Sequence, residues 1–312
     1  MSDSSPSLCI ITPTHRRDIE QFSLLRRSIR HFAPTLPHFA IVNTEDWHAF
    51  SKRFRGEPML EIITTADVLP RSVERRRRKT GPKWRTGAWW YGRVVKGWHA
   101  QQLAKIFALA QCRYEAAVFL DSDVFVCRAL EPSYFYVDGK LKLFRQRALN
   151  AEAADFDATT YDILGTPLHR VPIESLYDYI YSPSCFRKST AERLLEEFRI
   201  RERPRWIRRF LAERRPSEYN LLGHSAMVLE GGSGYHLVEC PPTDLHHSVR
   251  FPEDKAHFEV EIEHMLRQPK HFALIQSTLH IEFREIERAF DRLMVAHSGG
   301  SPGDLEKRPL PG

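Results

Sequence analysis

The sequence has no run of 18 apolar residues, so it predicts no helix that spans a membrane. Its first seven residues, MSDSSPS, lack the basic and apolar segments that make a signal peptide. No internal repeat is found either. Together with unpaired cysteines, which are typical of a reducing compartment, these features lead us to expect a cytoplasmic protein, with the inner face of the membrane as a second possible location.

Cysteine is scarce and scattered. Five cysteines stand at positions 9, 112, 127, 185 and 240, and no two of them form a CxxC pair. An odd number at such spacing argues against a disulfide framework and against a structural zinc site. We expect free thiols.

What is present is the composition of a globular protein, with 42% apolar, 28% charged and 11% aromatic residues among 312. This length suits one large α/β domain or two smaller ones. The net charge is +6, and the excess is concentrated in RSVERRRRK (71–79) and RIRERPRWIRRFLAERR (199–215). Basic clusters indicate acidic partners: phosphates, anionic lipids or nucleic acid.

Short apolar segments alternate with segments of helical spacing in the first part of the chain. Strands are predicted at residues 8–12, 39–44, 59–64 and 118–120, and helices at 19–32, 46–54 and 98–112. This order is typical of the α/β class, with a Rossmann-type, mostly parallel central sheet and helices on both faces. The basic and aromatic segment 71–93 interrupts the order, and we predict a mobile loop there.

The pattern is looser beyond residue 130. Strands are predicted at 140–146 and 271–277, and helices at 188–202, 217–226, 258–266 and 281–294, with Ser217 as a helix cap. We expect one domain over residues 8–297, between a disordered N-terminus (1–7) and a disordered Gly- and Pro-rich tail (298–312).

The segment AAVFLDSDVFVC, residues 116–127, contains the most informative motif. Asp121 and Asp123 directly follow the apolar strand 118–120, and residues 124–126 continue the strand pattern. Burying unpaired carboxylates costs on the order of several kcal/mol, so they must either bind something or lie in contact with water. In open α/β sheets, ligands bind at the carboxyl ends of the strands. Two such carboxylates can hold one Mn²⁺ or Mg²⁺ ion together with phosphate oxygens.

A short D-x-D motif is weak evidence alone, and an exposed turn without metal is the alternative. The chain carries a second match at Asp155 and Asp157. These two stand in a polar stretch, where we expect them to be solvated and to need no ligand.

Two enzyme classes place this motif after an apolar strand. In phosphohydrolases of the haloacid-dehalogenase type, the first aspartate is a nucleophile near the N-terminus, whereas about a hundred residues precede Asp121 here. In glycosyltransferases of the GT-A fold, the motif ends a strand in the middle of the chain. The position of the motif favours the glycosyltransferase.

Four segments together resemble a largely uncharacterised family of bacterial glycosyltransferases in the GT-A (nucleotide-diphospho-sugar transferase) superfamily. They are CIITPTHRRDIEQFSLLRRSI (9–29), GWHAQQLAKI (97–106), VFLDSDVFV (118–126) and SEYNLLG (217–223). The resemblance covers residues 8–226 and is poor beyond 230. One departure is Leu222, where the family tends to carry a second Tyr. The resemblance implies a donor half at about 8–130 and an acceptor half at about 131–297.

The resemblance also implies roles for residues outside the D-x-D motif. The loop after the first strand would meet the donor nucleotide, and the helix before the motif would contact the donor sugar or its phosphates. The donor-binding candidates are Thr14, Arg16, Asp18, Gln101, Gln102, Lys105 and Ser122. For both segments, a solvated loop or helix face is the alternative.

Further candidates lie late in the chain. Glu218 can act as general base for an acceptor hydroxyl, or it can simply favour a helix N-terminus. His246, His247 and His280 are candidates for a third metal ligand, as GT-A enzymes often use a late His, and His280 is preferred because it follows a strand edge. We assign Asp121, Asp123 and His280 to the metal, and Glu218 with Asp123 to catalysis.

The sequence thus predicts a metal-dependent transferase that moves a sugar from a nucleoside diphosphate sugar to a surface-polysaccharide or lipid-linked acceptor. The rivals are a metal-dependent phosphohydrolase and a non-catalytic module that binds anionic surfaces. Trp206, Ile207, Phe210 and Leu211 recur at helical spacing among arginines. They indicate either contact with an anionic membrane or packing on the core. No nucleic-acid recognition motif is present.

Overall fold

The computed structural model describes residues 7–79, 95, 97–147, 151–165, 176–200, 206–213, 216–239, 246–250, 252–268 and 270–297. The two chain ends that we predicted to be disordered lie outside these residues, apart from Ser7. The second half of the predicted loop, 80–93, lies outside them as well. None of the described helices combines the length and the apolar character that crossing a bilayer requires.

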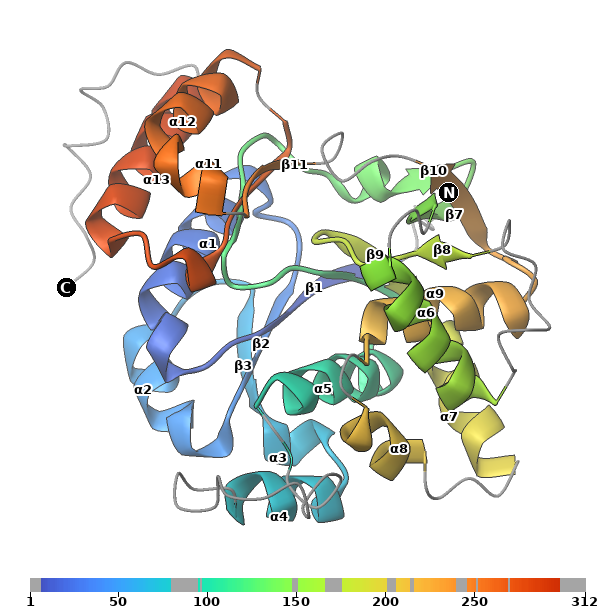
Figure 1. Cartoon of the computed structure of the whole chain (residues 1–312). Coiled ribbons are helices and arrows are strands. Elements are labelled where there is room, and N and C mark those ends of the chain that lie inside the picture. Colours follow the sequence, from blue (N-terminus) through green and yellow to red (C-terminus); the bar gives the residue numbers. More distant parts are fainter. Residues whose placement is uncertain are drawn as a thin grey trace, which may run out of the picture.

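A five-stranded sheet forms the centre of the molecule (Figure 1), in the order β3-β2-β1-β4-β9. Its strands are β1 (Leu8–Pro13), β2 (His38–Val42), β3 (Leu60–Thr64), β4 (Ala116–Phe119) and β9 (Ser184–Arg187). The first four are parallel, and β9 runs antiparallel to β4. Because β1, β2 and β4 are buried along their whole length, they appear in the sequence as mostly apolar runs, in which Thr12 and His38 are the buried polar residues. The predicted mostly parallel α/β sheet is confirmed.

Helices cover both faces of this sheet (Figure 1). After β1 come η1 (Arg16–Asp18) and α1 (Ile19–Phe32), and after β2 come η2 (Thr44–Asp46) and α2 (Trp47–Arg53). After β3 come α3 (Thr65–Val68), α4 (Arg71–Lys79) and α5 (Gly97–Gln111). The short β-strands and buried helix faces belong to one apolar core that extends from Leu8 to Met294.

Two smaller sheets flank the central one. The first has the order β10-β7-β6, with β8 paired to β7. It is built from β6 (Tyr136–Val137), which follows η5 (Pro132–Phe135), and from β7 (Lys140–Arg147), β8 (Tyr177–Asp178) and β10 (Tyr235–Glu239). The second has the order β11-β12-β5, from β5 (Val124–Val126), β11 (His246–Val249) and β12 (Phe272–Ile275).

The remaining helices fall into two groups (Figure 1). The first comprises α6 (Ala151–Leu164), α7 (Lys188–Ile200), α8 (Trp206–Ala212) and α9 (Glu218–Val228). The second comprises α11 (Pro252–Ala256), α12 (Phe258–Arg267) and, after η8 (Ser277–Leu279), α13 (Phe283–His297), and it packs beside α1. The predicted helices of the second half are present, and Ser217 caps α9 by accepting the Asn220 N–H.

The strand order places a topological switch point between β1 and β4. From β1 the chain builds outward through β2 and β3, and it then returns to place β4 on the other side of β1. At such a point the loops after two neighbouring parallel strands diverge and leave a crevice. The loop after β1 starts at Thr14, and the loop after β4 contains Asp121 and Asp123.

The D-x-D segment is a turn between two sheets, and this corrects the prediction that residues 124–126 continue the preceding strand. The Val124 N–H donates to the Asp121 carbonyl (3.1 Å), which closes the turn. Strand β5 then pairs antiparallel with β12 in a different sheet. The strand ends before Asp121 because the chain leaves the central sheet there.

Residues 71–79 correct the prediction of a loop over 71–93, because they form helix α4. Arginine and lysine have high helix propensity, and Glu74 and Arg77, three residues apart, join on one face. Arg77 also binds Glu45 and Asn43 beside η2. Part of the basic run is therefore committed to ion pairs within the fold.

Most of the apolar stripe at 206–211 packs on the core in helix α8. Trp206, Phe210 and Leu211 are buried, and the Trp206 ring stacks on Phe198 with centroids 4.6 Å apart. Ile207 is only half-buried. Packing on the core therefore accounts for three residues of the stripe, and contact with an anionic membrane stays a prediction.

Candidate active site

A cavity of about 610 Å³ lies at the switch point, beside the carboxyl ends of β1 and β4. Its size falls in the range of about 300–1,000 Å³ that small-molecule sites occupy. It is lined by residues from the β1 loop, α5, the D-x-D turn, α9 and the ends of β11 and β12. Elements from both halves of the chain therefore enclose one space.

The D-x-D turn is held at the cavity wall by backbone contacts. The Asp121 N–H donates to Ser182 Oγ (3.1 Å), and the Ile275 N–H donates to the Asp123 carbonyl (3.0 Å). Asp123 Oδ2 accepts the Ser277 N–H at 3.2 Å. Both carboxylates and Ser122 line the cavity. The two aspartates thus end the strand and also face a common space.

A buried lysine joins the turn to α9. Lys105 Nζ on α5 lies 2.8 Å from Asp121 Oδ1 and 2.7 Å from Glu218 Oε1. It also donates to the Tyr219 hydroxyl (2.7 Å), which in turn donates to Asp121 Oδ2 (3.2 Å). Lys105 is 3% exposed and Glu218 is 2% exposed. Three separate parts of the chain therefore meet through one ammonium group.

The charges of this cluster follow from burial and pairing. Burial alone would lower the pKa of Lys105, but Asp121 and Glu218 raise it well above its ordinary value. Burial raises the pKa of Glu218, and Lys105 opposes that rise. Burial and the charge of Asp121 raise the pKa of Asp123 to about 7. Lys105 is therefore charged at neutral pH, whereas two carboxyl groups have pKa values closer to neutrality than usual.

The other α5 candidates also reach the cavity. Gln101 and Gln102 line it, together with Trp98, which is 47% exposed. Gln102 is 3% exposed, and its Oε1 has no hydrogen-bond partner among the described residues. A buried amide oxygen without a partner is costly. Its position is suited to accept a hydrogen bond from a ligand.

The loop after β1 divides the predicted donor-binding residues. Asp18 lines the cavity and pairs with His15 Nδ1 at 2.9 Å. Thr14 is buried, and Arg16 is exposed with its backbone N–H bound to Asp46 (3.1 Å); neither lines the cavity. The structure brings Asp18 to the site and leaves Thr14 and Arg16 outside its lining.

Of the histidines considered as third metal ligands, His247 and His280 do not line the cavity. His280 is exposed and ends η8 in the left-handed region (φ +52°). His247 is buried, with Nε2 bound to the Gln268 carbonyl. The side chain of His246 lies outside the described residues. Gln276, Ser277 and Arg250 line the cavity in this region instead.

The residues at the turn fit a divalent metal held with a phosphate ligand. Among the described residues, no group of three His, Cys, Asp or Glu side chains gathers at one point. Asp121 and Asp123 nevertheless supply two hard carboxylate oxygens at one wall, and burial, together with the charge of Asp121, raises the pKa of Asp123. Mg²⁺ is commonly bound by one or two carboxylates with substrate phosphates and waters.

The second D-x-D pair corrects the expectation that both of its aspartates are solvated. Asp155 is exposed, but Asp157 on α6 is completely buried. Asp157 Oδ1 lies 2.9 Å from His224 Nε2 and accepts from Asn220 Nδ2 at 3.3 Å. Local sequence patterns could not predict this pairing, because the partners of Asp157 lie 63 and 67 residues away on α9.

Tyr219, Arg250 and Gln276 are cavity residues that the sequence did not point to. Tyr219 follows Glu218 directly in SEYNLLG, so its place in a matched segment was an available signal. Arg250 and Gln276 stand at the ends of two strands beyond residue 230, where the sequence carries no recognisable motif.

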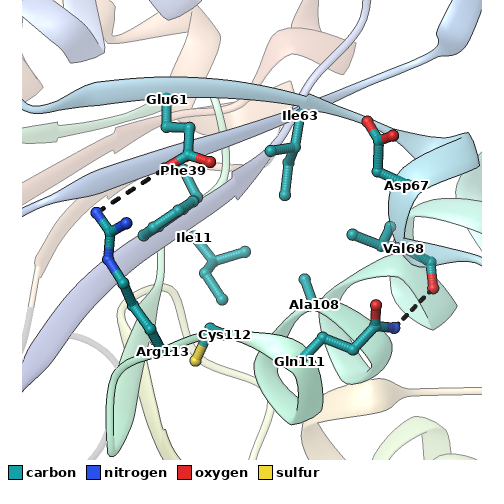
Figure 2. A pocket seen from close by; sticks show the side chains of 10 residues that line it. All are labelled: Ile11, Phe39, Glu61, Ile63, Asp67, Val68, Ala108, Gln111, Cys112 and Arg113. Atoms are coloured by element: carbon teal, nitrogen blue, oxygen red, sulfur yellow. Dashed lines mark hydrogen bonds and ion pairs between the residues drawn. The ribbon is translucent and has the colours of Figure 1, made fainter.

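A second, smaller cavity of about 220 Å³ lies between the strands β1 to β3 and the helices α3 and α5. Figure 2 shows Ile11, Phe39 and Ile63 facing Ala108 and Val68 across it. The polar groups at its edge are already paired: Arg113 with Glu61 (3.9 Å), and Gln111 with the Val68 carbonyl (3.0 Å). It offers little chemistry, so the larger cavity is the candidate active site.

The model of one protein family matches residues 6–298, nearly the whole chain. The chain belongs to the family of unknown function DUF6492. The match extends past residue 230, where the motifs read from the sequence ended. No curated protein matches the sequence.

The solved structures that are similar to this chain include glycosyltransferases. The galactosyltransferase LgtC, with donor and acceptor sugar analogues, has a TM-score of 0.47 and 10% identity, over 90% of this chain and 94% of that one. Mouse xyloside xylosyltransferase 1 has a TM-score of 0.40 and 9% identity, over 88% and 100%. GlyE of Streptococcus pneumoniae has a TM-score of 0.41 and 11% identity, over 92% and 60%. Such low scores carry no argument about function, which rests on the site itself.

Proposed function

We propose that this protein is a metal-dependent glycosyltransferase that moves a sugar from a nucleoside diphosphate sugar to a glycan or lipid-linked acceptor. One observation carries the proposal. A cavity at the switch point of a parallel sheet joins the Asp121–Asp123 pair, through Lys105, to Glu218. Open α/β sheets bind nucleotides at this position.

In this proposal, Asp121 and Asp123 would hold Mn²⁺ or Mg²⁺. When bound, the ion would supply Lewis acidity toward the departing diphosphate. The chain's own residues do the rest: Lys105 fixes Asp121 in place, and Gln101, Gln102 and Asp18 meet the donor from the cavity wall. Arg250 is a second basic residue in the lining, suited to a diphosphate.

Glu218 is the proposed general base. As the acceptor oxygen bonds to the anomeric carbon, its hydroxyl proton passes to Glu218, and the bond from that carbon to the diphosphate breaks. A base works best when its pKa lies near the operating pH, and burial raises the pKa of Glu218 in that direction. Lys105 holds the carboxylate in the cavity wall through Oε1.

The rival functions differ in what they turn over. The full chain is incubated with Mn²⁺ and a panel of nucleotide sugars, and with simple phosphomonoesters. A transferase slowly hydrolyses one donor in the absence of acceptor and leaves the phosphoesters intact. A phosphohydrolase with Asp121 as nucleophile releases phosphate from the phosphoesters. If the protein turns over neither nucleotide sugars nor phosphomonoesters, both enzyme assignments are contradicted and a binding module remains.

A further inference from the structure

Strands β7 and β8, which are distant from the D-x-D turn in the sequence, also contribute residues to the lining of the cavity. Asp178 on β8 lines the cavity and is 8% exposed. It pairs in register with Gln146 on β7, which also lines the cavity. Neither residue belongs to a motif in the sequence.

Three neutral groups hold the Asp178 carboxylate, and one of them is the side-chain amide of Asn220. The Ile180 N–H donates to Oδ1 (2.9 Å), and Gln146 Nε2 donates to Oδ2 (3.2 Å). Among the described residues, no Lys, Arg or His lies within ion-pair distance of it. Burial raises its pKa, and the charge of Asp157 adds to that rise. Burying a carboxylate without a cation lowers the stability of the fold. A role in binding a ligand would explain why such a residue stands there.

The surroundings select the class of ligand. A carboxylate offers about four acceptor positions, and the three protein donors still leave room for a ligand hydroxyl. Phe156 and Ile180 add apolar surface to the lining of the same cavity, and Gln146 adds an amide. A phosphate would be repelled by the carboxylate. A second metal would need more carboxylates, and the nearby Asp157 is engaged with His224 and Asn220.

We propose that Asp178 and Gln146 form a subsite for a pyranose, in which sugar hydroxyls donate to the Asp178 carboxylate while the apolar face of the ring packs on Phe156 and Ile180. The proposal rests on the glycosyltransferase function and specifies its sugar site. The pyranose can come from the donor or from the acceptor, and the two sources are separated by experiment.

The first arm compares each nucleoside diphosphate with its nucleotide sugar by calorimetry in Mn²⁺, for the wild-type protein and Asp178→Asn. If the donor sugar occupies the subsite, the variant and the wild type bind the nucleoside diphosphate equally well. The variant should then bind the nucleotide sugar about tenfold or more weakly than the wild type does. The control is Asp138→Asn, the same change in an exposed turn at φ +48°, a conformation that Asn accepts.

The second arm needs no nucleotide. Methyl glucosides, galactosides, mannosides and N-acetylglucosaminides are tested by saturation-transfer NMR on the wild type and both variants. If an acceptor sugar occupies the subsite, one glycoside binds the wild type and Asp138→Asn but not Asp178→Asn. The melting temperature of Asp178→Asn should change little, because the new amide oxygen can still accept from the Ile180 N–H and Gln146 can turn its own amide oxygen toward the new NH2 group.

The outcomes separate the two proposals. Failure of the wild type to bind any nucleotide contradicts the transferase, while the glycoside arm still tests the subsite. Equal sugar affinity of wild type and Asp178→Asn in both arms overturns the subsite and leaves the transferase in place. The same holds if the wild type binds nucleotide but no sugar in either arm.

Discussion

At the scale of single residues, the site depends on the three hydrogen bonds that Lys105 donates to Asp121, Glu218 and Tyr219. Its ammonium binds one carboxylate of the D-x-D turn and one carboxylate of α9, both within 2.8 Å. Removing one partner of a buried ion pair leaves an uncompensated charge. Lys105 therefore couples the proposed metal-holding residue to the proposed base, and each must be tested without removing the lysine.

Glu218→Gln tests the base in this way. The amide keeps the size of the side chain and can still accept from Lys105, but it cannot take a proton. Transfer should fall about 100-fold or more, since a positioned base contributes about 10²–10⁴-fold. The dissociation constant of the donor nucleotide should stay within about twofold. If the transfer rate is unchanged and only the stability of the fold falls, Glu218 serves the N-terminus of helix α9 instead. If the affinity for the donor nucleotide is lost, Glu218 belongs to the nucleotide site.

The second D-x-D pair offers a matched comparison of two aspartates on one helix. Asp157→Asn should destabilise the protein, because it disturbs the buried contacts to His224 and Asn220. We expect a loss of about 1–3 kcal/mol in the free energy of unfolding. Asp155→Asn, at an exposed position, should change it by less than about 0.5 kcal/mol. Both variants should keep turnover per folded molecule within about threefold; a hundredfold loss would mean that this pair belongs to the site.

At the scale of elements, α4 is joined to η2 by the ion pairs of Arg77. The hydrogen bond from Arg77 lowers the pKa of Glu45. Burial would raise the pKa of Glu74, but the contacts with Arg77 and Thr44 outweigh it and lower that pKa as well. A carboxyl whose folded pKa is depressed stabilises the fold above its ordinary value and loses that contribution as the pH falls through its folded pKa.

This predicts a stability loss in acid that depends on Arg77. Between pH 7 and pH values below the ordinary value of 4.5 for both glutamates, the wild type should lose stability to urea. In Arg77→Met the starting stability should be lower and the further loss in acid smaller, because the depressed pKa values return toward normal. The contribution of Glu45 is modest, since its side chain is half exposed. An equal acid-induced loss in both proteins would contradict this account.

The elements also show what could be predicted from the sequence. Strands β1 to β4 and helix α1 follow from apolar runs and spacing, and Ser217 follows from capping chemistry. The sequence does not predict helix α4, because its run of arginines resembles a solvated loop. The ion pair between Arg77 and Glu45 on η2 joins residues that are distant in the sequence. The two-residue strand β8 that carries Asp178 is too short to show any period. These features are fixed by contacts between distant segments, which local patterns do not record.

At the scale of the whole molecule, the candidate site lies where three parts of the chain converge. The chain leaves the central sheet at the D-x-D turn and enters the sheet of β11 and β12, and α9 is joined to the turn by Lys105. The apolar strand 118–120 pointed to Asp121 and Asp123, and the family resemblance implied Gln101, Gln102 and Lys105. All five line the cavity. The sequence could not place the bond between Lys105 and Glu218, which joins residues 113 positions apart.

The central claim is that the Asp121–Asp123 pair binds a nucleoside diphosphate through a divalent metal. Calorimetric titration of UDP and GDP into the full chain, first with Mn²⁺ and then with EDTA, tests it most directly. We predict that one nucleotide binds about tenfold or more tightly with Mn²⁺, and that Asp123→Asn abolishes the difference while its melting temperature stays the same or rises. Equal affinity in Mn²⁺ and in EDTA, or an undiminished metal effect in Asp123→Asn, would contradict the claim.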